Sequence, residues 1–160
     1  MNQLWAPWRI DYILSPKDQG CFLCTILAQA QDQDRANLVV HRGRTCSVVL
    51  NRYPYIGGHL MVAPYRHVDS LPGMTAEERA EMMELASRCV EILKTTMNPQ
   101  GFNVGINLGA PAGAGLKDHI HLHVVPRWVG DTNFMPVLGS TTVIPQALED
   151  LYDALHPHFP

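Results

Sequence analysis

The stretch His119-Ile120-His121-Leu122-His123-Val124-Val125, followed by Pro126-Arg127-Trp128, organises the rest of the chain. With the two-residue period of a strand, it places three histidines on one face and Ile120, Leu122 and Val124 on the other, where they can face a core. Successive imidazoles lie roughly 6 to 7 Å apart at the backbone and the outer two about 13 Å apart. One small ion therefore cannot bind all three.

Because of this spacing, the three histidines can have different functional roles. A terminal member can bind a metal ion, while the middle one, His121, can act as a nucleophile or proton carrier, because an unperturbed imidazole has a pKa of about 6.5. Two simpler explanations are polar residues on the solvent face of a half-buried strand and an opportunistic metal site. Three histidines in strict alternation favour an active site over both.

The composition indicates one globular domain. The chain has 160 residues, a hydrophobic fraction of 46% and a charged fraction of 17%. Its formal charge of -3 gives no general attraction to a nucleic acid polymer or an anionic membrane, so a bound phosphate needs a local site. No apolar stretch approaches the ~20 residues that cross a bilayer, and Met1-Asn2-Gln3-Leu4 does not open a signal peptide. We therefore expect a cytoplasmic protein with no membrane partner.

The cysteines divide into two groups. Cys46 and Cys89 lie in a strand-like and a helix-like apolar pattern and are expected in the core, whereas Cys21 and Cys24 form a C-x-x-C pair. For this pair a redox motif, half of a zinc site and two incidental thiols compete. Half of a zinc site is favoured, because a thioredoxin-like pair normally follows a strand in a βαβ setting that this sequence lacks.

The predicted elements describe an α+β fold with about five mainly antiparallel strands, one long helix and a C-terminal helix. A short helix over 25–33 is followed by a solvated connection, and a capping box, Thr75-Ala76-Glu77-Glu78, starts the long helix. Strands are expected at 38–41, 45–50, 59–63, 102–108 and in the histidine run. We expect one domain over 1–160, with an N-terminal aromatic arm (1–20), a core (21–128) and a C-terminal loop and helix (129–160).

A loop rich in Gly and Ala, residues 109–118, lies directly before the first triad histidine. Such a loop lets backbone N–H groups approach a ligand without side chains in the way, as phosphate-binding loops require. A flexible connector is the alternative for the loop alone. Its position next to the histidines favours phosphate binding by Gly113, Ala114 and Gly115, whose N–H groups can share charge on the equatorial oxygens.

With these residues identified, the chain resembles the histidine triad (HIT) family. The histidine run through Arg127 fits the family signature, and Asn51-Arg52 ahead of Gly58-His59 and the segment 102–107 lie where the family has its nucleotide pocket. The resemblance covers roughly residues 21–127. It implies the HIT α+β fold, usually as a homodimer whose two sheets meet across the interface; whether dimers pair into tetramers stays open.

The resemblance also implies roles for individual residues. In this family the middle histidine, here His121, attacks the α-phosphorus of a nucleotide and forms a nucleotidyl-histidine intermediate that water, phosphate or another acceptor breaks. His123 and His59 are implied to hold the phosphate and tune the nucleophile. Asn51 matches a ribose contact, and Asn107 matches an amide residue near the α-phosphate.

Some zinc-containing branches of the wider superfamily add one structural zinc per chain. The resemblance implies that the zinc ligands in this sequence are Cys21, Cys24, His67 and His119, with His41 as the alternative fourth ligand. Four protein ligands make a closed tetrahedral site, which is structural and would fasten the strand of the nucleophile to the N-terminal segment. The sequence leaves open whether magnesium accompanies the nucleotide substrate.

One departure from the family concerns the acceptor. Many HIT hydrolases carry Gln or Ser just before the triad, whereas residues 112–118 here offer no such side chain to place an attacking water. With the aromatic opening and Arg127-Trp128, this resembles the bacterial branch that includes diadenosine tetraphosphate phosphorylases, in which phosphate is the acceptor and the products are ATP and ADP. A hydrolase of dinucleoside polyphosphates or nucleoside phosphoramidates and a zinc-stabilised nucleotide-binding module are the alternatives.

Overall fold

The structure is a computed structural model that describes residues 20–131 and 146–159. The predicted aromatic arm lies outside the described residues except for Gly20, as does most of the predicted C-terminal loop. The described elements, in chain order, are α2 (Phe22–Leu27), η1 (Gln31–Gln33), α3 (Asp34–Asn37), β1 (Val39–Arg42), β2 (Cys46–Leu50), β3 (Leu60–Pro64), α4 (Ala76–Met97), β4 (Gly101–Ile106), η2 (Ala110–Ala112), β5 (Leu122–Arg127), α6 (Leu148–Leu155) and η3 (His156–His158).

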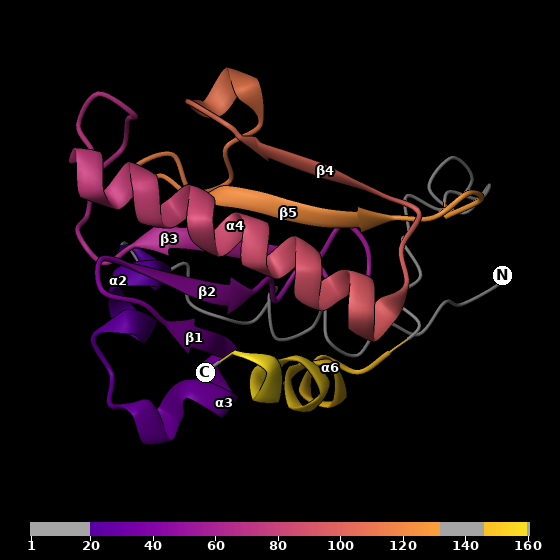
Figure 1. The fold of residues 1–160 in the computed structure, drawn as a ribbon. Coiled ribbons are helices and arrows are strands. Elements are labelled where there is room, and N and C mark those ends of the chain that lie inside the picture. The colour runs from indigo at the N-terminus through magenta and orange to yellow at the C-terminus, as the bar shows by residue number, and fades with distance from the viewer. Residues whose placement is uncertain (1–19, 132–145, 160) are drawn as a thin grey trace, which may run out of the picture.

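One antiparallel sheet carries the fold. Its five strands lie in the order β1-β2-β3-β5-β4, and every neighbouring pair is antiparallel. The expected α+β fold with about five mainly antiparallel strands is therefore confirmed. β5, which carries His123, lies between β3 and β4 (Figure 1) and has a hydrogen-bonded neighbour on each side.

The long helix begins where the sequence predicts. The Thr75 hydroxyl accepts a hydrogen bond from the N–H of Glu78 at 3.1 Å, and the Glu78 carboxylate accepts one from the N–H of Thr75 at 2.7 Å. From this capping box α4 runs across one face of the sheet and contacts β2, β3 and β5 (Figure 1). Among the described helices, none has the length and apolar composition that a membrane span requires.

The two faces of the sheet carry separate apolar layers. On the α4 face, Ile120, Leu122 and Val124 belong to the main core, as the two-residue period predicts. On the opposite face, Leu23 and Leu27 of α2 form a second cluster with residues of β1, β2 and β3. The histidines that alternate with the core residues therefore face the side of the sheet on which α2 packs.

The prediction of one helix over residues 25–33 is wrong, because α2 ends at Leu27 and a separate short helix, η1, begins at Gln31. α2 begins early because the Cys21 sulfur caps it, accepting the N–H of Cys24 at 3.5 Å. The connection predicted to follow this helix instead folds into α3. Asp34 holds it in place through Arg42, with a carboxylate oxygen and a guanidinium nitrogen 2.7 Å apart.

β4 is shorter than the strand predicted over residues 102–108. It spans Gly101–Ile106, and Val104 on its apolar side is 46% exposed. β4 is one of the two edge strands of the described sheet, and β1 is the other. β4 therefore presents apolar side chains and one free hydrogen-bonding edge, a combination that invites pairing with another strand.

Candidate active site and metal centre

The histidine run enters the sheet later than predicted. β5 begins at Leu122, so His119 and His121 precede the strand. Their segment is held by other contacts: the N–H of Ile120 donates to the carbonyl of Val68 at 2.7 Å. All three triad histidines are nonetheless buried.

His123 lies within the strand and on the α2 side of the sheet. It pairs with Met61 of β3 and with Gly105 of β4. Directly opposed residues of an antiparallel ladder point to the same face, and Met61 belongs to the apolar cluster under α2. The imidazole of His123 therefore emerges on the face away from α4.

Gly58 places His59 beside His123. Its φ of +87° is a left-handed conformation that side chains rarely adopt, and a Cβ there would lie 2.8 Å from the sulfur of Met97 and 2.9 Å from Cγ of Pro126. Glycine is thus required both by the backbone and by the close approach of α4 and β5. The chain then enters β3 with His59 fully buried.

The hydrogen bonds around His59 fix the protonation of two rings. The N–H of Tyr55 donates to Nδ1 of His59 at 3.2 Å, and the Asn51 amide also lies 3.2 Å from that atom. Because a backbone N–H can only donate, Nδ1 carries the lone pair and neutral His59 holds its hydrogen on Nε2. That hydrogen is donated to Nδ1 of His123 at 2.8 Å, so neutral His123 also carries its hydrogen on Nε2.

Both rings of this pair remain neutral at pH 7. Burial, and secondly the charges of His123 and His121, lower the pKa of His59 to about 3. Burial, and secondly His121, lower the pKa of His123 to about 4. His123 can therefore donate a hydrogen bond from Nε2 without carrying a charge.

Acid should destabilise the protein through this pair. Each pKa lies below the ordinary histidine value of 6.5, so between pH 6.5 and about 4 the unfolded chain binds protons that the folded chain does not. Stability is therefore complete above pH 6.5 and is lost as the pH falls, by on the order of 3 kcal/mol between pH 7 and pH 5. Denaturant unfolding across this range measures it.

The matched control for this prediction is His59→Asn, which removes one of the two groups. The part of the pH dependence of its unfolding free energy that comes from the buried histidines should be about half as steep as in the wild type. The contribution of the metal ligands should be unchanged. Equal slopes for the two proteins would show that the buried pair does not set the acid sensitivity.

His121 is oriented by the chain that precedes it. Its Nδ1 lies 2.9 Å from the backbone carbonyl oxygen of His119. Because a carbonyl can only accept, neutral His121 carries its hydrogen on Nδ1 and its lone pair on Nε2. The ring packs edge-on against His123, with centroids 4.7 Å apart, so the lone pair and the His123 N–H belong to one site.

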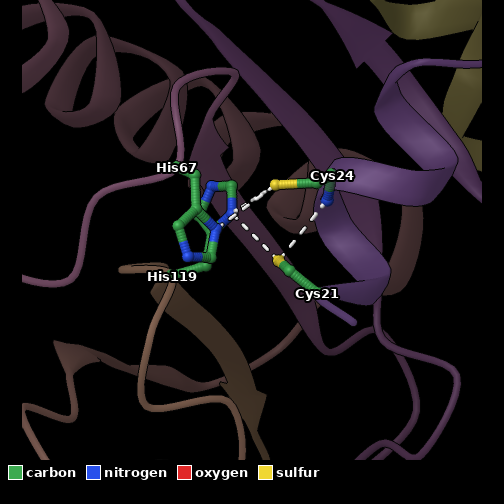
Figure 2. A group of neighbouring side chains, drawn as sticks. All are labelled: Cys21, Cys24, His67 and His119. Atoms are coloured by element: carbon green, nitrogen blue, oxygen red, sulfur yellow. Dashed lines mark hydrogen bonds between the residues drawn. The ribbon is translucent and has the colours of Figure 1, made fainter. Parts of the chain in front are cut away.

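Four side chains from three segments converge next to this site. Cys21 and Cys24 come from the start of α2, His67 follows β3, and His119 precedes β5, as Figure 2 shows. Nδ1 of His119 lies 3.1 Å from the sulfur of Cys21 and 3.4 Å from that of Cys24, which is 3.3 Å from Nδ1 of His67. The four ligand atoms all lie within 4.8 Å of one another.

These residues fit a tetrahedral metal ion. Thiolate and imidazole ligands of zinc stand about 3.5 Å apart around the ion, close to the spacing found here. Nε2 of His119 donates to the carbonyl of Pro64 at 2.8 Å, which directs the Nδ1 lone pair toward the two sulfurs. Burial, and secondly Cys21, raise the pKa of the Cys24 thiol, so a cation that binds here displaces a proton.

The structure confirms the predictions for the two remaining cysteines and contradicts the one for His41. Cys46 and Cys89 are buried in the main core, as expected. The alternative prediction of His41 as the fourth metal ligand is wrong. Its ring stacks on Phe159, with centroids 5.4 Å apart, and it is not a member of the metal cluster.

The Gly- and Ala-rich loop folds back on itself. The N–H of Gly113 donates to the carbonyl of Ala110 at 3.0 Å, and that of Ala114 donates to Gly109 at 3.3 Å. Two of the three amides predicted to bind phosphate therefore donate within the loop, and phosphate binding by Gly113, Ala114 and Gly115 stays a prediction. The N–H of Gly115 has no protein acceptor within the described residues. A Cβ on Gly113 would lie 3.9 Å from the Asn107 amide nitrogen, so the loop approaches Asn107.

Sequence reasoning missed two features of the site. The carbonyl groups of Pro64 and His119 orient imidazoles, but backbone acceptors leave no sequence signal. The second feature, Tyr55, packs its ring on His59. The signal available in the sequence was an aromatic residue four positions before His59, which itself follows a glycine.

Comparisons with known proteins agree on one family. The HIT domain family model matches residues 32–129. The chain is 42% identical over 156 residues to the AP-4-A phosphorylase of Mycobacterium tuberculosis, covering 94% of this chain and 80% of that protein. It is 27% identical over 93 residues to the asymmetrical bis(5'-nucleosyl)-tetraphosphatase of Schizosaccharomyces pombe, covering 58% of this chain and 50% of that protein.

Solved structures share the fold. A zinc-bound histidine triad family protein from Mycobacterium smegmatis matches with a TM-score of 0.68 at 25% identity, covering 87% of this chain and 92% of that chain. A histidine triad nucleotide-binding protein from Sulfolobus tokodaii matches with a TM-score of 0.66 at 22% identity, covering 86% of this chain and 88% of that chain.

Proposed function

The chain belongs to the HIT domain family, and on that premise we propose that it is a nucleotidyl transferase that converts diadenosine tetraphosphate and phosphate into ATP and ADP. Two displacements occur at one α-phosphorus. In the first, Nε2 of His121 forms a bond to phosphorus and the bridging oxygen leaves with ATP. In the second, inorganic phosphate forms the new P–O bond, the P–N bond breaks, and ADP leaves.

The single observation that carries this proposal is the hydrogen bond from Nδ1 of His121 to the carbonyl of His119. It leaves an unprotonated Nε2 as the nucleophile, which needs no general base. When Nε2 forms the bond to phosphorus, the ring becomes positively charged and the same carbonyl stabilises its N–H. This acceptor therefore serves both the free and the nucleotidylated states of the ring.

The neighbouring histidines act as neutral donors in this proposal. The hydrogen on Nε2 of His123 is directed to an oxygen of the reacting phosphate, because its Nδ1 is occupied by His59. A donor aimed at the position where charge develops stabilises the transition state. We propose that Asn107 and the N–H of Gly115, which has no acceptor among the described residues, bind the same phosphate. The Asn51 amide already contacts His59, so only its remaining hydrogen-bonding capacity is proposed to reach the ribose.

Zinc is the ion proposed for the four-residue cluster. Its support is the ligand set of two cysteines and two histidines, with the spacing of a tetrahedral site, and the zinc-bound relative from M. smegmatis. All four positions are filled by protein, so the ion supplies no open coordination site and serves as a cross-link between α2 and the segments around β3 and β5.

We propose a homodimer that pairs through β4. The strand is one of the two edge strands of the described sheet, and Val104 presents apolar surface there. A second copy placed edge to edge would continue the sheet and cover this side chain.

Phosphate dependence tests the proposed reaction. With diadenosine tetraphosphate and ³²P-labelled phosphate, the label should appear in the β position of ADP, because phosphate attacks the nucleotidyl-histidine. Without phosphate, ADP should not form, because its β-phosphorus comes from the added phosphate. ATP release should also fall at least about tenfold, because this pocket offers no Gln or Ser side chain at residues 112–118 to place a water. The assay is run with and without magnesium, which would bind the substrate phosphates.

The other candidate functions predict different products. A hydrolase, the activity named for the S. pombe relative, would release AMP at the same rate in phosphate-free buffer. A nucleotide-binding module would bind AMP and cleave no phosphoanhydride. Either result would replace the phosphorylase assignment.

A further inference from the structure

Tyr55 forms the outer wall of the His59–His123 pair. Its ring stacks on His59 with centroids 4.6 Å apart and planes 30° apart, and its centroid lies 5.8 Å from that of His123. The tyrosine is 57% exposed, whereas His59 is 0% and His123 9% exposed. One side of the tyrosine therefore covers the imidazoles while the rest faces solvent.

The main chain of the same residue sets the direction of the hydrogen bonds. Its N–H donates to Nδ1 of His59, which leaves the His59 hydrogen on Nε2 for His123. Had the N–H been absent, His59 could carry its hydrogen on Nδ1 and accept from His123, which would then present a bare Nε2 to the substrate. A bare nitrogen facing a phosphate oxygen would repel it.

We propose that Tyr55 is a positioning residue for the nucleotidyl transfer: its amide selects the tautomer of His59, and its ring excludes water from the histidine pair. His123 is thereby kept neutral, with its hydrogen aimed at the phosphate. The catalytic role of Tyr55 rests on the proposed function, whereas the measurement of the histidine tautomers that tests it does not. Among the described residues, the titratable groups whose charges act on His59 are His123 and His121, and neither is an anion that would oppose the effect of burial.

The tautomers can be observed directly. Wild type, Tyr55→Phe and Tyr55→Ala are labelled with ¹⁵N-histidine as full-length, metal-loaded proteins, and the ring nitrogens are followed by NMR from pH 8 to pH 5. In wild type and Tyr55→Phe, His59 and His123 should carry hydrogen on Nε2 and show no titration above about pH 5. Tyr55→Phe preserves the ring and so controls for the hydroxyl.

Tyr55→Ala separates the amide from the ring. Its backbone N–H remains, so the tautomer of His59 should be retained. Water should reach the pair and raise the pKa of His123, which is about 4 in the wild type, by at least about two units, so that the pair titrates above pH 5. The acid limb of the kcat profile should move upward by a similar amount, with KM changed by less than about twofold. A folded spectrum shows that the variant retains its structure.

Two results would overturn the inference. One is a wild-type His59 with its hydrogen on Nδ1, and the other is a Tyr55→Ala protein whose histidine pair still fails to titrate above pH 5. Both are read from ring nitrogens without turnover, so they are independent of whether the substrate is a dinucleoside polyphosphate.

Discussion

Replacing His121 with alanine is expected to lower the turnover of diadenosine tetraphosphate by more than about 10,000-fold, which is the upper end of the loss typical for a general acid or base. The reason is that the substitution removes the atom that forms the intermediate, Nε2, rather than a group that assists it. Single-turnover assays with quenched samples should detect a nucleotidylated wild-type protein and none for His121→Ala.

Matched variants distinguish this effect from general damage to the site. His123→Ala removes a hydrogen-bond donor but leaves the nucleophile, so it should slow turnover by about 100- to 10,000-fold and still accumulate the intermediate. His158→Ala changes an exposed histidine of η3, outside the site, and should have no effect. An intermediate that forms in His121→Ala, or full activity of that variant, would end the mechanism.

A smaller side chain allows a positive test of the second displacement. In His121→Gly the space of the imidazole is vacated, so adenosine 5'-phosphorimidazolide supplies the ring and the activated phosphorus together. The remaining site should transfer the adenylyl group to phosphate and form ADP, although diadenosine tetraphosphate stays uncleaved. This result would locate the loss in the nucleophile and show that the site remains folded.

The sequence predicted which residues of the histidine run face the core, because this depends only on local alternation. Alternation with a period of two places Ile120, Leu122 and Val124 against α4 whichever strands lie on either side. The capping box at Thr75 was predictable for the same reason, since its two hydrogen bonds join residues three apart. Such features need no knowledge of tertiary structure.

The sequence could not give features that depend on distant partners. β5 begins at Leu122, not at His119, because the preceding residues are held by the carbonyl of Pro64 and by Cys21, 98 positions away. The exposure of Val104 depends on which strand lies at the sheet edge, and alternation is the same for an edge and a central strand. The tautomers of the histidines likewise follow from backbone groups of other segments.

Removing the proposed metal should produce the largest loss of stability. Cys24→Ser is expected to lower the metal content from about one zinc per chain to near zero, measured by elemental analysis after dialysis. The free energy of unfolding should then fall by on the order of 5 kcal/mol, because metal binding to the folded state alone contributes its binding energy to folding. Chelator added to wild type should produce a comparable decrease in the unfolding temperature.

Two variants control for the side chains themselves. Cys89→Ala removes a buried thiol outside the cluster, so it should keep the metal and lose only the packing energy of a small cavity. His67→Ala removes the exposed ligand, which packs little, and should reproduce the metal loss of Cys24→Ser. Normal metal content in either ligand variant would contradict the assigned ligands.

Activity should fall together with the metal, because one residue serves both sites. His119 faces the metal cluster through its Nδ1 and, through its carbonyl, accepts the hydrogen of the His121 ring. Without the ion, the segment before β5 loses its attachment to α2, and His121 is free to turn or to exchange its tautomer. In His67→Ala, kcat should therefore decrease while the protein remains folded at low temperature, and ¹⁵N spectra should show a mixture of His121 tautomers. A metal-free protein with wild-type kcat and one His121 tautomer would show that the carbonyl is held by the sheet alone.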